Sequence, residues 1–335
     1  MLAVVGRALD RAAFSPDTLP DDVVIGLALV PSLIAGLIIF KLAALEMLVV
    51  ALIAGVIGQV AARIVFRRFV PRPESSPLIA AIIGVALVGP GASLVTTAEV
   101  AVLAVALELV RSRYAPAVHA QAGLLAFALI AVATGDVFKY VSPSGSSPLD
   151  PIAIWKLFPP GAAPIDPVRL YVGNVPGPVF ATSLMAVVIG MAWLTYAKRL
   201  SPIVAIGFLL GGIVPIALYH WDFVFQLDSG PLWFVGALIL SDRRQLPDSW
   251  AIRPVLGFIA GLAAVAVRNR GFGIDGAIYT VAAVQAAVAV VVVLIWTVST
   301  TRKRRERNQR LRRRELQLRS VNPPVEEAAD PSAVA

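Results

Sequence analysis

The sequence predicts an all-α, polytopic transmembrane protein with about ten helices. Of its 335 residues, 58% are hydrophobic and 15% are charged, whereas soluble globular proteins carry roughly 25% charged residues. Apolar segments long enough to cross a bilayer recur through most of the length. Lys and Arg concentrate in alternate connections between these segments, as the positive-inside rule requires. These observations exclude an ordinary water-soluble enzyme and a disordered chain.

Ten apolar segments can be marked, with ends placed to within about 2–4 residues. They cover residues 23–42, 44–62, 77–93, 95–110, 116–134, 177–197, 202–219, 231–241, 252–267 and 274–298. Residues 1–22 contain no apolar core that would make a cleavable signal. The first span is therefore expected to act as an uncleaved insertion signal.

Basic residues orient these spans. With a cytoplasmic N-terminus, the inner connections hold 13 Lys and Arg residues and the outer connections hold six, before ten more between Arg302 and Arg319 are counted. The sequence therefore predicts a bacterial-type plasma membrane protein with both termini cytoplasmic. Residues 1–22 and a basic, partly disordered tail, 299–335, are expected on the inner side. This tail explains the net charge of +8 better than nucleic-acid binding does.

The chain has no Cys and two His residues. The absence of Cys excludes disulfides, thiolate zinc sites and iron–sulfur clusters. His119 is expected at the inner end of the fifth span and His220 at the outer end of the seventh, about 30 Å apart. They therefore cannot share one haem or metal, and each is interpreted as an interfacial or core polar residue.

Two short spans indicate an internal repeat. Pro77–Gly89 runs into a Gly-Pro-Gly sequence, and Pro231–Ser241 is about three turns long. They are the third spans of two successive five-helix sets, 23–134 and 177–298. Short, Gly/Pro-interrupted segments at matching positions are typical of inverted repeats around a central site. Two unrelated short helices are the alternative.

Few acidic side chains fall inside the predicted spans. Glu46 and Glu99 lie near outer helix ends, where solvation at the headgroup level explains them. Glu108 lies deeper, near the inner end of the fourth span. It is expected either to snorkel or to pair with Arg111 three residues later.

The longest polar connection, residues 135–176, is expected on the outer side. It is rich in Pro and Gly and holds Trp155, Phe158 and Tyr171, which suit the headgroup level. Loops longer than about 12–15 residues are usually functional or serve as linkers, and a plain linker is the alternative here.

Short motifs in this loop and after it carry a family resemblance. Ser144-Gly145-Ser146-Ser147-Pro148-Leu149 resembles the Ser-Gly-Ala-Thr-Pro-Leu motif of the RnfD/NqrB family, the membrane subunits of Rnf and Na⁺-translocating NADH:quinone oxidoreductase complexes. Gly173-Asn174-Val175-Pro176-Gly177, followed by Thr182-Ser183, resembles a second segment of that family, as do Asp242 and Asp275-Gly276 further on. The similarity covers about residues 20–300.

The resemblance implies a covalent flavin. In the family, the motif's Thr carries FMN through a phosphoester bond that a separate flavin transferase makes from FAD, and Ser147 stands at that position. Ser144, Gly145 and Ser146 form the rest of the expected attachment turn, and a plain Ser/Gly/Pro turn is the alternative. A second, non-covalent flavin such as riboflavin is a further candidate cofactor.

The resemblance also marks cofactor-binding candidates in the second half. These are Gly173, Asn174, Gly177, Thr182, Ser183 and Asp242. Backbone amides at a helix start favour an anion such as the flavin phosphate. An ordinary helix cap is the alternative for Thr182 and Ser183.

The chain also departs from the family pattern. Phe180-Ala181 replaces a Gly-Glu, and Arg243 follows Asp242 where the family has Pro. Val118-His119-Ala120-Gln121 replaces an Asn-Pro-Ala, and Gln285 stands in for an Asn. A pumped cation generally needs a carboxylate or organised oxygens inside the membrane. These losses weaken the prediction of ion translocation more than that of flavin binding.

Three functions follow as hypotheses. The first is an electron-transfer subunit of a membrane oxidoreductase or translocase complex, rather than a stand-alone enzyme, with other subunits, a flavin transferase and quinone as candidate partners. The second is a secondary transporter or channel for a small solute, without a flavin. The third is a scaffold whose basic tail anchors cytoplasmic partners, for which a solvated juxtamembrane helix is the simpler interpretation.

Overall fold

The computed structural model describes residues 19–66, 76–115, 118, 120–143, 151–157, 165–243, 246, 249–294 and 297. Over these residues the chain is all-α, and its β-structure is limited to an isolated bridge between Leu200 and Asp242. The helices pack into one unit, Met1–Ala289, and a second unit, Val290–Ala335, begins within the last helix.

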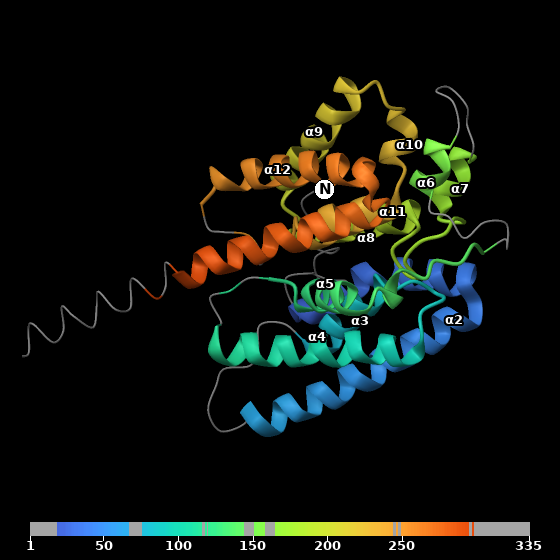
Figure 1. Cartoon of the computed structure of the whole chain (residues 1–335). Coiled ribbons are helices and arrows are strands. Elements are labelled where there is room, and N and C mark those ends of the chain that lie inside the picture. Colours follow the sequence, from blue (N-terminus) through green and yellow to red (C-terminus); the bar gives the residue numbers. More distant parts are fainter. Residues whose placement is uncertain are drawn as a thin grey trace, which may run out of the picture. The chain divides into compact units, whose positions relative to one another are not determined.

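Each of the ten predicted segments contains helix (Figure 1). The helices are α2 (Asp21–Phe66), which covers the first two segments, α3 (Pro77–Ala86), α4 (Leu94–Tyr114), α5 (Ala122–Thr134), α8 (Leu184–Tyr196), α9 (Pro202–Leu218), α11 (Gly230–Trp233) continued by the π-helix η3 (Phe234–Ile239), α12 (Ile252–Val267) and Asp275–Leu294. Short helices α6 (Pro151–Lys156), α7 (Pro167–Val172) and α10 (Phe223–Leu227) lie in the connections, and η2 (Asp136–Phe138) and η5 (Arg268–Phe272) follow α5 and α12.

Helix α2 is two helices joined at a kink. Lys41 has φ 50° and ψ −117°, which no helix allows. The first half packs on α8, where the indole N–H of Trp193 donates to the carbonyl oxygen of Val24 at 2.9 Å. The second half packs on α3, where a Cβ built on Gly55 would lie 2.6 Å from Leu78. The two predicted spans are therefore separate helices.

Three predicted spans are shorter than the sequence indicated. Helix α3 ends at Ala86 rather than at residue 93. Helix α5 begins at Ala122 rather than at residue 116, and α8 begins at Leu184 rather than at residue 177. The residues between 177 and 183 are buried but not helical. Irregular backbone at membrane depth is tolerated where protein surrounds it.

The described helices have the lengths and surfaces of a multi-pass membrane protein. Three are long and apolar enough to cross a membrane, Asp21–Ile64, Ile252–Phe272 and Asp275–Leu294, and five apolar helices are shorter. Large apolar side chains remain on the surface, among them Ile38 at 69% and Ile64 at 71% exposure. Lipid is the environment that suits such a surface, since large exposed apolar patches promote aggregation in water.

Helix α3 and the continuous α11–η3 helix match in length and start. Each has ten residues, which is about 15 Å, or half of a hydrocarbon core about 30 Å thick. Ser76 and Ser229 are their N-caps, and each helix has Pro in its first turn. These features agree with the predicted inverted repeat, which itself stays a prediction.

Helices α9 and α12 pack against each other through glycines (Figure 1). Gly207 and Gly211 on α9, and Gly257 and Gly261 on α12, are spaced four residues apart. A Cβ built on Gly261 would lie 1.9 Å from the carbonyl oxygen of Phe208. The two backbones therefore approach as closely as they do in small-xxx-small membrane interfaces.

The Gly261→Ala variant is expected to lose about 1–3 kcal/mol of unfolding free energy, because its methyl group overlaps the Phe208 carbonyl. Unfolding in detergent, followed by circular dichroism, measures this. Gly26→Ala on α2 is the control, since its nearest new neighbour, Ile79 Cδ1, is 3.5 Å away. Equal stability of the two variants would contradict the packing argument.

Candidate functional site

The predicted attachment turn, Ser144, Gly145, Ser146 and Ser147, lies outside the described residues, as does His119. The described chain stops at Pro143 and resumes at Pro151, where α6 begins. Pro151, the first described residue after the attachment loop (residues 144–150), is buried.

Four other candidates lie together on the buried, non-helical segment between α7 and α8. Gly173 ends α7 with φ 92°, and a Cβ built on it would lie 2.6 Å from the backbone nitrogen of Ser183. A Cβ on Gly177 would lie 2.4 Å from the methyl carbon of Thr182. The fold thus brings these four residues together, while Asn174 in the same segment is exposed.

Backbone hydrogen bonds fix this segment to the end of α3. The N–H of Val179 donates to the Val88 carbonyl at 2.8 Å, and the N–H of Phe180 donates to the Ala86 carbonyl at 3.1 Å. Carbonyls at a helix C-terminus lack partners within the helix. The segment supplies those partners, so its irregular course carries a structural function.

Ser183 is the N-cap of α8, because its Oγ accepts a hydrogen bond from the N–H of Ala186 at 3.3 Å. This is the ordinary cap that the sequence left open. Thr182 instead lies beside the start of α11. A Cβ built on Gly230 would be 2.1 Å from the Thr182 carbonyl oxygen, so only Gly fits at that position.

A small cleft lies between this segment and the start of α11. Its space of about 220 Å³ is mostly open to solvent, and its interior has room for about one water molecule. Its lining residues are Pro151, Leu170, Val175, Pro176, Thr182, Asp228, Ser229, Gly230, Pro231 and Ile274. The cleft therefore joins the first residue after the attachment loop to the predicted cofactor-binding segment.

Asp228 is the ionisable residue of this lining. Burial raises the pKa of its carboxyl group above the ordinary value, and the nearby Asp222 raises that pKa further. The Asp228 carboxyl group is therefore protonated more readily than a free Asp. Neutral polar ligand groups suit this lining better than a phosphate does.

Asp242 lies away from the cleft. It follows η3, so the α11–η3 helix, about 15 Å long, separates it from Gly230. Its carboxylate is buried and lies 3.8 Å from Nη2 of Arg199. Arg199 also pairs with Asp21 at the start of α2. The structure thus brings Asp242 to an ion-pair cluster and not to the other candidates.

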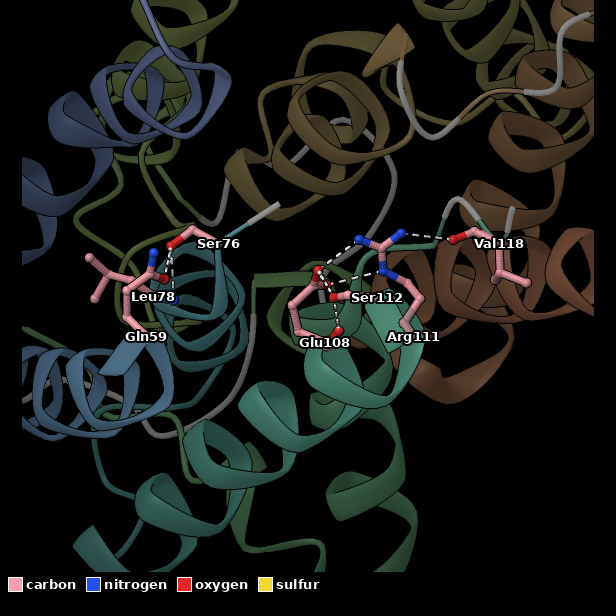
Figure 2. A network of polar contacts seen from close by, with 7 residues as sticks. All are labelled: Gln59, Ser76, Leu78, Glu108, Arg111, Ser112 and Val118. Atoms are coloured by element: carbon pink, nitrogen blue, oxygen red, sulfur yellow. Dashed lines mark hydrogen bonds and ion pairs between the residues drawn. The ribbon is translucent and has the colours of Figure 1, made fainter. Parts of the chain in front are cut away.

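Glu108 pairs with Arg111, one of the two alternatives that the sequence left open (Figure 2). Nη2 and Nε of Arg111 lie 2.7 Å and 3.2 Å from the two carboxylate oxygens. Nη1 of Arg111 donates to the Val118 carbonyl at 2.9 Å. Glu108 is 1% exposed, so this guanidinium replaces water as its partner.

Figure 2 also shows the start of α3. Oγ of Ser76 donates to Oε1 of Gln59 at 2.9 Å and accepts from the N–H of Leu78 at 3.3 Å. The backbone N–H of Ser76 hydrogen-bonds the Asp22 carboxylate, which also interacts electrostatically with Glu108. The sequence analysis missed this network because its members are distant along the chain.

Asp136 is a second polar anchor that the sequence did not single out. Oδ2 accepts from the N–H of Ser93 at 3.0 Å and from Oγ1 of Thr96 at 2.7 Å, and Oδ1 lies 2.5 Å from Nζ of Lys139. The Lys139 hydrogen bond, followed by those from Ser93 and Thr96, holds the pKa of Asp136 well below its usual range. The Ser-x-x-Thr start of α4 signalled a cap, but not this partner.

Within the described ranges, no group of three or more His, Asp or Glu side chains could hold a metal ion. The fold and this geometry define a polytopic, all-α membrane protein with two half-length helices around a buried irregular segment. The chain belongs to the NQR2, RnfD, RnfE family, whose model matches residues 21–295. This membership places it among the membrane subunits of Rnf/Nqr-type complexes. A search of curated proteins found no match.

The Asp136→Asn variant should lower the melting temperature at neutral pH and flatten its acid dependence. A carboxyl group whose pKa falls on folding stabilises the folded state above its unfolded pKa, and this stabilisation is lost as pH falls through the folded-state pKa. Melting temperatures measured from pH 7 to about pH 2 check this, because the loss begins near the unfolded-state pKa of about 4 and continues below it. Parallel pH profiles for wild type and variant would contradict it.

The Arg111→Ala variant should lose about 3–5 kcal/mol of unfolding free energy, since it leaves the buried Glu108 carboxylate without its cation. Detergent-denaturation titrations provide the measurement. The exposed Arg113→Ala is the matched control and should change little. Adding Glu108→Gln to Arg111→Ala should recover part of the loss, and no recovery would argue against an electrostatic cause.

Proposed function

We propose that this chain is a membrane electron-transfer subunit of an Rnf/Nqr-like complex that carries FMN through a phosphoester to Ser147. The proposal combines the family membership with the Ser-Gly-Ser-Ser-Pro-Leu sequence at residues 144–149. Ser147 and the termini take the orientation that the basic residues predict, with the attachment loop outside and both termini in the cytoplasm.

The observation that carries the proposal is the cleft. Its lining includes a residue that follows the attachment turn and a residue of the second family-like segment. Pro151 follows Ser147 by four residues and lines the cleft, and Thr182 lines it from the second motif. Four residues of extended chain span at most about 14 Å. A group tethered at Ser147 would therefore stay close to Thr182.

The residues around the cleft fit part of a flavin. The Thr182 and Ser229 side chains supply hydroxyl groups, and Leu170 and Ile274 supply apolar surface. The Asp228 carboxyl group, whose pKa is raised by burial, is a further polar group of the lining. These groups suit contacts with the edge of a flavin that lies over the opening of the cleft, while the phosphate stays at the serine. The flavin itself supplies one- and two-electron redox chemistry when bound, and the protein contributes its placement and exclusion from bulk water.

The proposed partners follow from this role. Other subunits of the complex exchange electrons with the flavin, and a flavin transferase attaches it. Quinone and a second flavin such as riboflavin remain candidates. Coupling to cation transport would need carboxylates such as the half-buried Asp22 and the buried Glu108 and Asp242.

A secondary transporter or channel is the second candidate function. The specific observation in its favour is the pair of ten-residue helices, α3 and α11–η3, since discontinuous helices frame the substrate sites of many transporters. A transporter would move solute into liposomes without any chromophore, so the flavin decides between the two functions.

Co-expression with a flavin transferase is expected to give a fluorescent band on a denaturing gel, because a phosphoester survives denaturation whereas bound flavin does not. Ser147→Ala should abolish the band. Ser146→Ala and Ser144→Ala are matched controls, because each removes a neighbouring hydroxyl from the same turn, and both should keep the band.

Persistence of the band in Ser147→Ala would exclude that serine as the attachment site. A wild-type protein that stays colourless with the transferase present, yet mediates solute flux, would replace the redox proposal by the transporter.

A further inference from the structure

One face of α9 carries exposed apolar side chains in its first half and again at its end. Ile206, Leu210 and Leu218 are exposed on this face, whereas Phe208 and Pro215 on the other side are buried. The spacing of the exposed residues places them on one side of the helix. In a multi-pass membrane protein this side faces lipid acyl chains.

The turn after α9 continues this surface without a break. The N–H of Trp221 donates to the Ile216 carbonyl at 3.0 Å, and His220 between them has φ 53°, the pattern of a Schellman motif. Asp222 then caps α10, its Oδ1 accepting from the N–H of Phe225 at 2.7 Å. The chain therefore passes from α9 to α10 through two fixed caps and not through a loose loop.

Four large side chains in this short stretch are exposed. They are Leu218, Tyr219, Phe223 and Val224, with Leu218 at 70% and Phe223 at 45% exposure, and we name them the apolar rim. Surface apolar residues that occur singly need no explanation, but a contiguous group marks a protein or membrane contact.

A series of aromatic ring contacts connects the apolar rim to α6. Tyr219 stacks on Trp221 at 5.0 Å between ring centroids, and Trp221 meets Trp155 of α6 edge to face at 6.5 Å. Trp155 stacks on the buried Phe225 at 5.9 Å. This row of rings joins α10 to α6, the helix that follows the attachment loop.

Two observations identify the occupant of the apolar rim as the lipid bilayer surface. The rim is continuous with the exposed side of α9, and Tyr219 of the rim stacks on Trp221. Tyr and Trp are the residues enriched where headgroups meet acyl chains. We infer that the apolar rim inserts into the headgroup layer and holds α6 and α10 against the membrane. This inference does not depend on the flavin.

Single-cysteine spin labelling tests the inference cleanly, because the wild-type chain has no Cys to remove. Phe223→Cys and Tyr219→Cys are labelled with a nitroxide in liposomes of phosphatidylethanolamine and phosphatidylglycerol. Collisions with oxygen, which concentrates in lipid, and with a water-soluble nickel chelate are then measured. Leu210→Cys on α9 is the lipid control, and Asn174→Cys, exposed on the segment before α8, is the water control.

The expected result is an oxygen-to-nickel collision ratio several-fold above that of Asn174→Cys and below that of Leu210→Cys. A ratio equal to that of Asn174→Cys would overturn the inference. Shielding of the labels from both reagents in liposomes would also overturn it, since it would mean that a second copy of the chain covers the rim. Water exposure in liposomes combined with shielding from both reagents in native membranes would assign the rim to a partner protein instead.

Discussion

Inside a bilayer, every backbone donor and acceptor needs a hydrogen-bond partner within the protein. Because α3 ends early, its last carbonyl groups need partners from other segments. The helix stops at Ala86, with its last carbonyls well inside the packed helices. Amides of Val179 and Phe180 bond the carbonyls of Val88 and Ala86. Further along, Gly89 N–H bonds the Val137 carbonyl at 2.8 Å. The segment before α8 and the η2 segment are therefore both held where α3 ends. The cleft forms beside the segment before α8.

Close contacts between helix backbones also hold this fold together. Carbonyl oxygens lie within 2.5 Å of the place where a side chain would begin at Gly123, Gly190 and Gly261. Helices in lipid gain no hydrophobic free energy from burying one another, so dispersion contacts at short range must hold them together. Glycine permits that approach, and the same property makes the interfaces intolerant of a single added methyl group.

The helices were predictable because apolar segments of bilayer length have few other solutions. The Glu108–Arg111 pair was predictable because its partners are three residues apart. The irregular course of residues 177–183 was not, since an apolar composition fits a buried loop as well as a helix, although Pro176 and Pro178 were available signals. The facing Gly-x-x-x-Gly motifs of α9 and α12 were also readable in the sequence.

The candidate site was predictable in part, for a related reason. Gly173, Gly177, Thr182 and Ser183 came together because they lie within one short segment. The resemblance grouped Asp242 with them, because a sequence motif gives no distances in space. In the structure, the α11–η3 helix separates Asp242 from the cleft. The contact of Asp22 with Ser76 has no sequence signature at all.

The packing of the first half of α2 on α8 has a consequence for biosynthesis. Val24 and Trp193, which share a hydrogen bond, are 169 residues apart. At elongation rates of about 5–20 residues per second, the second arrives roughly 8–34 s after the first. Throughout that interval the opening helix resides in the membrane with its eventual contact face turned to lipid or to the insertion machinery. Completion of the tertiary structure therefore awaits translation of the later half.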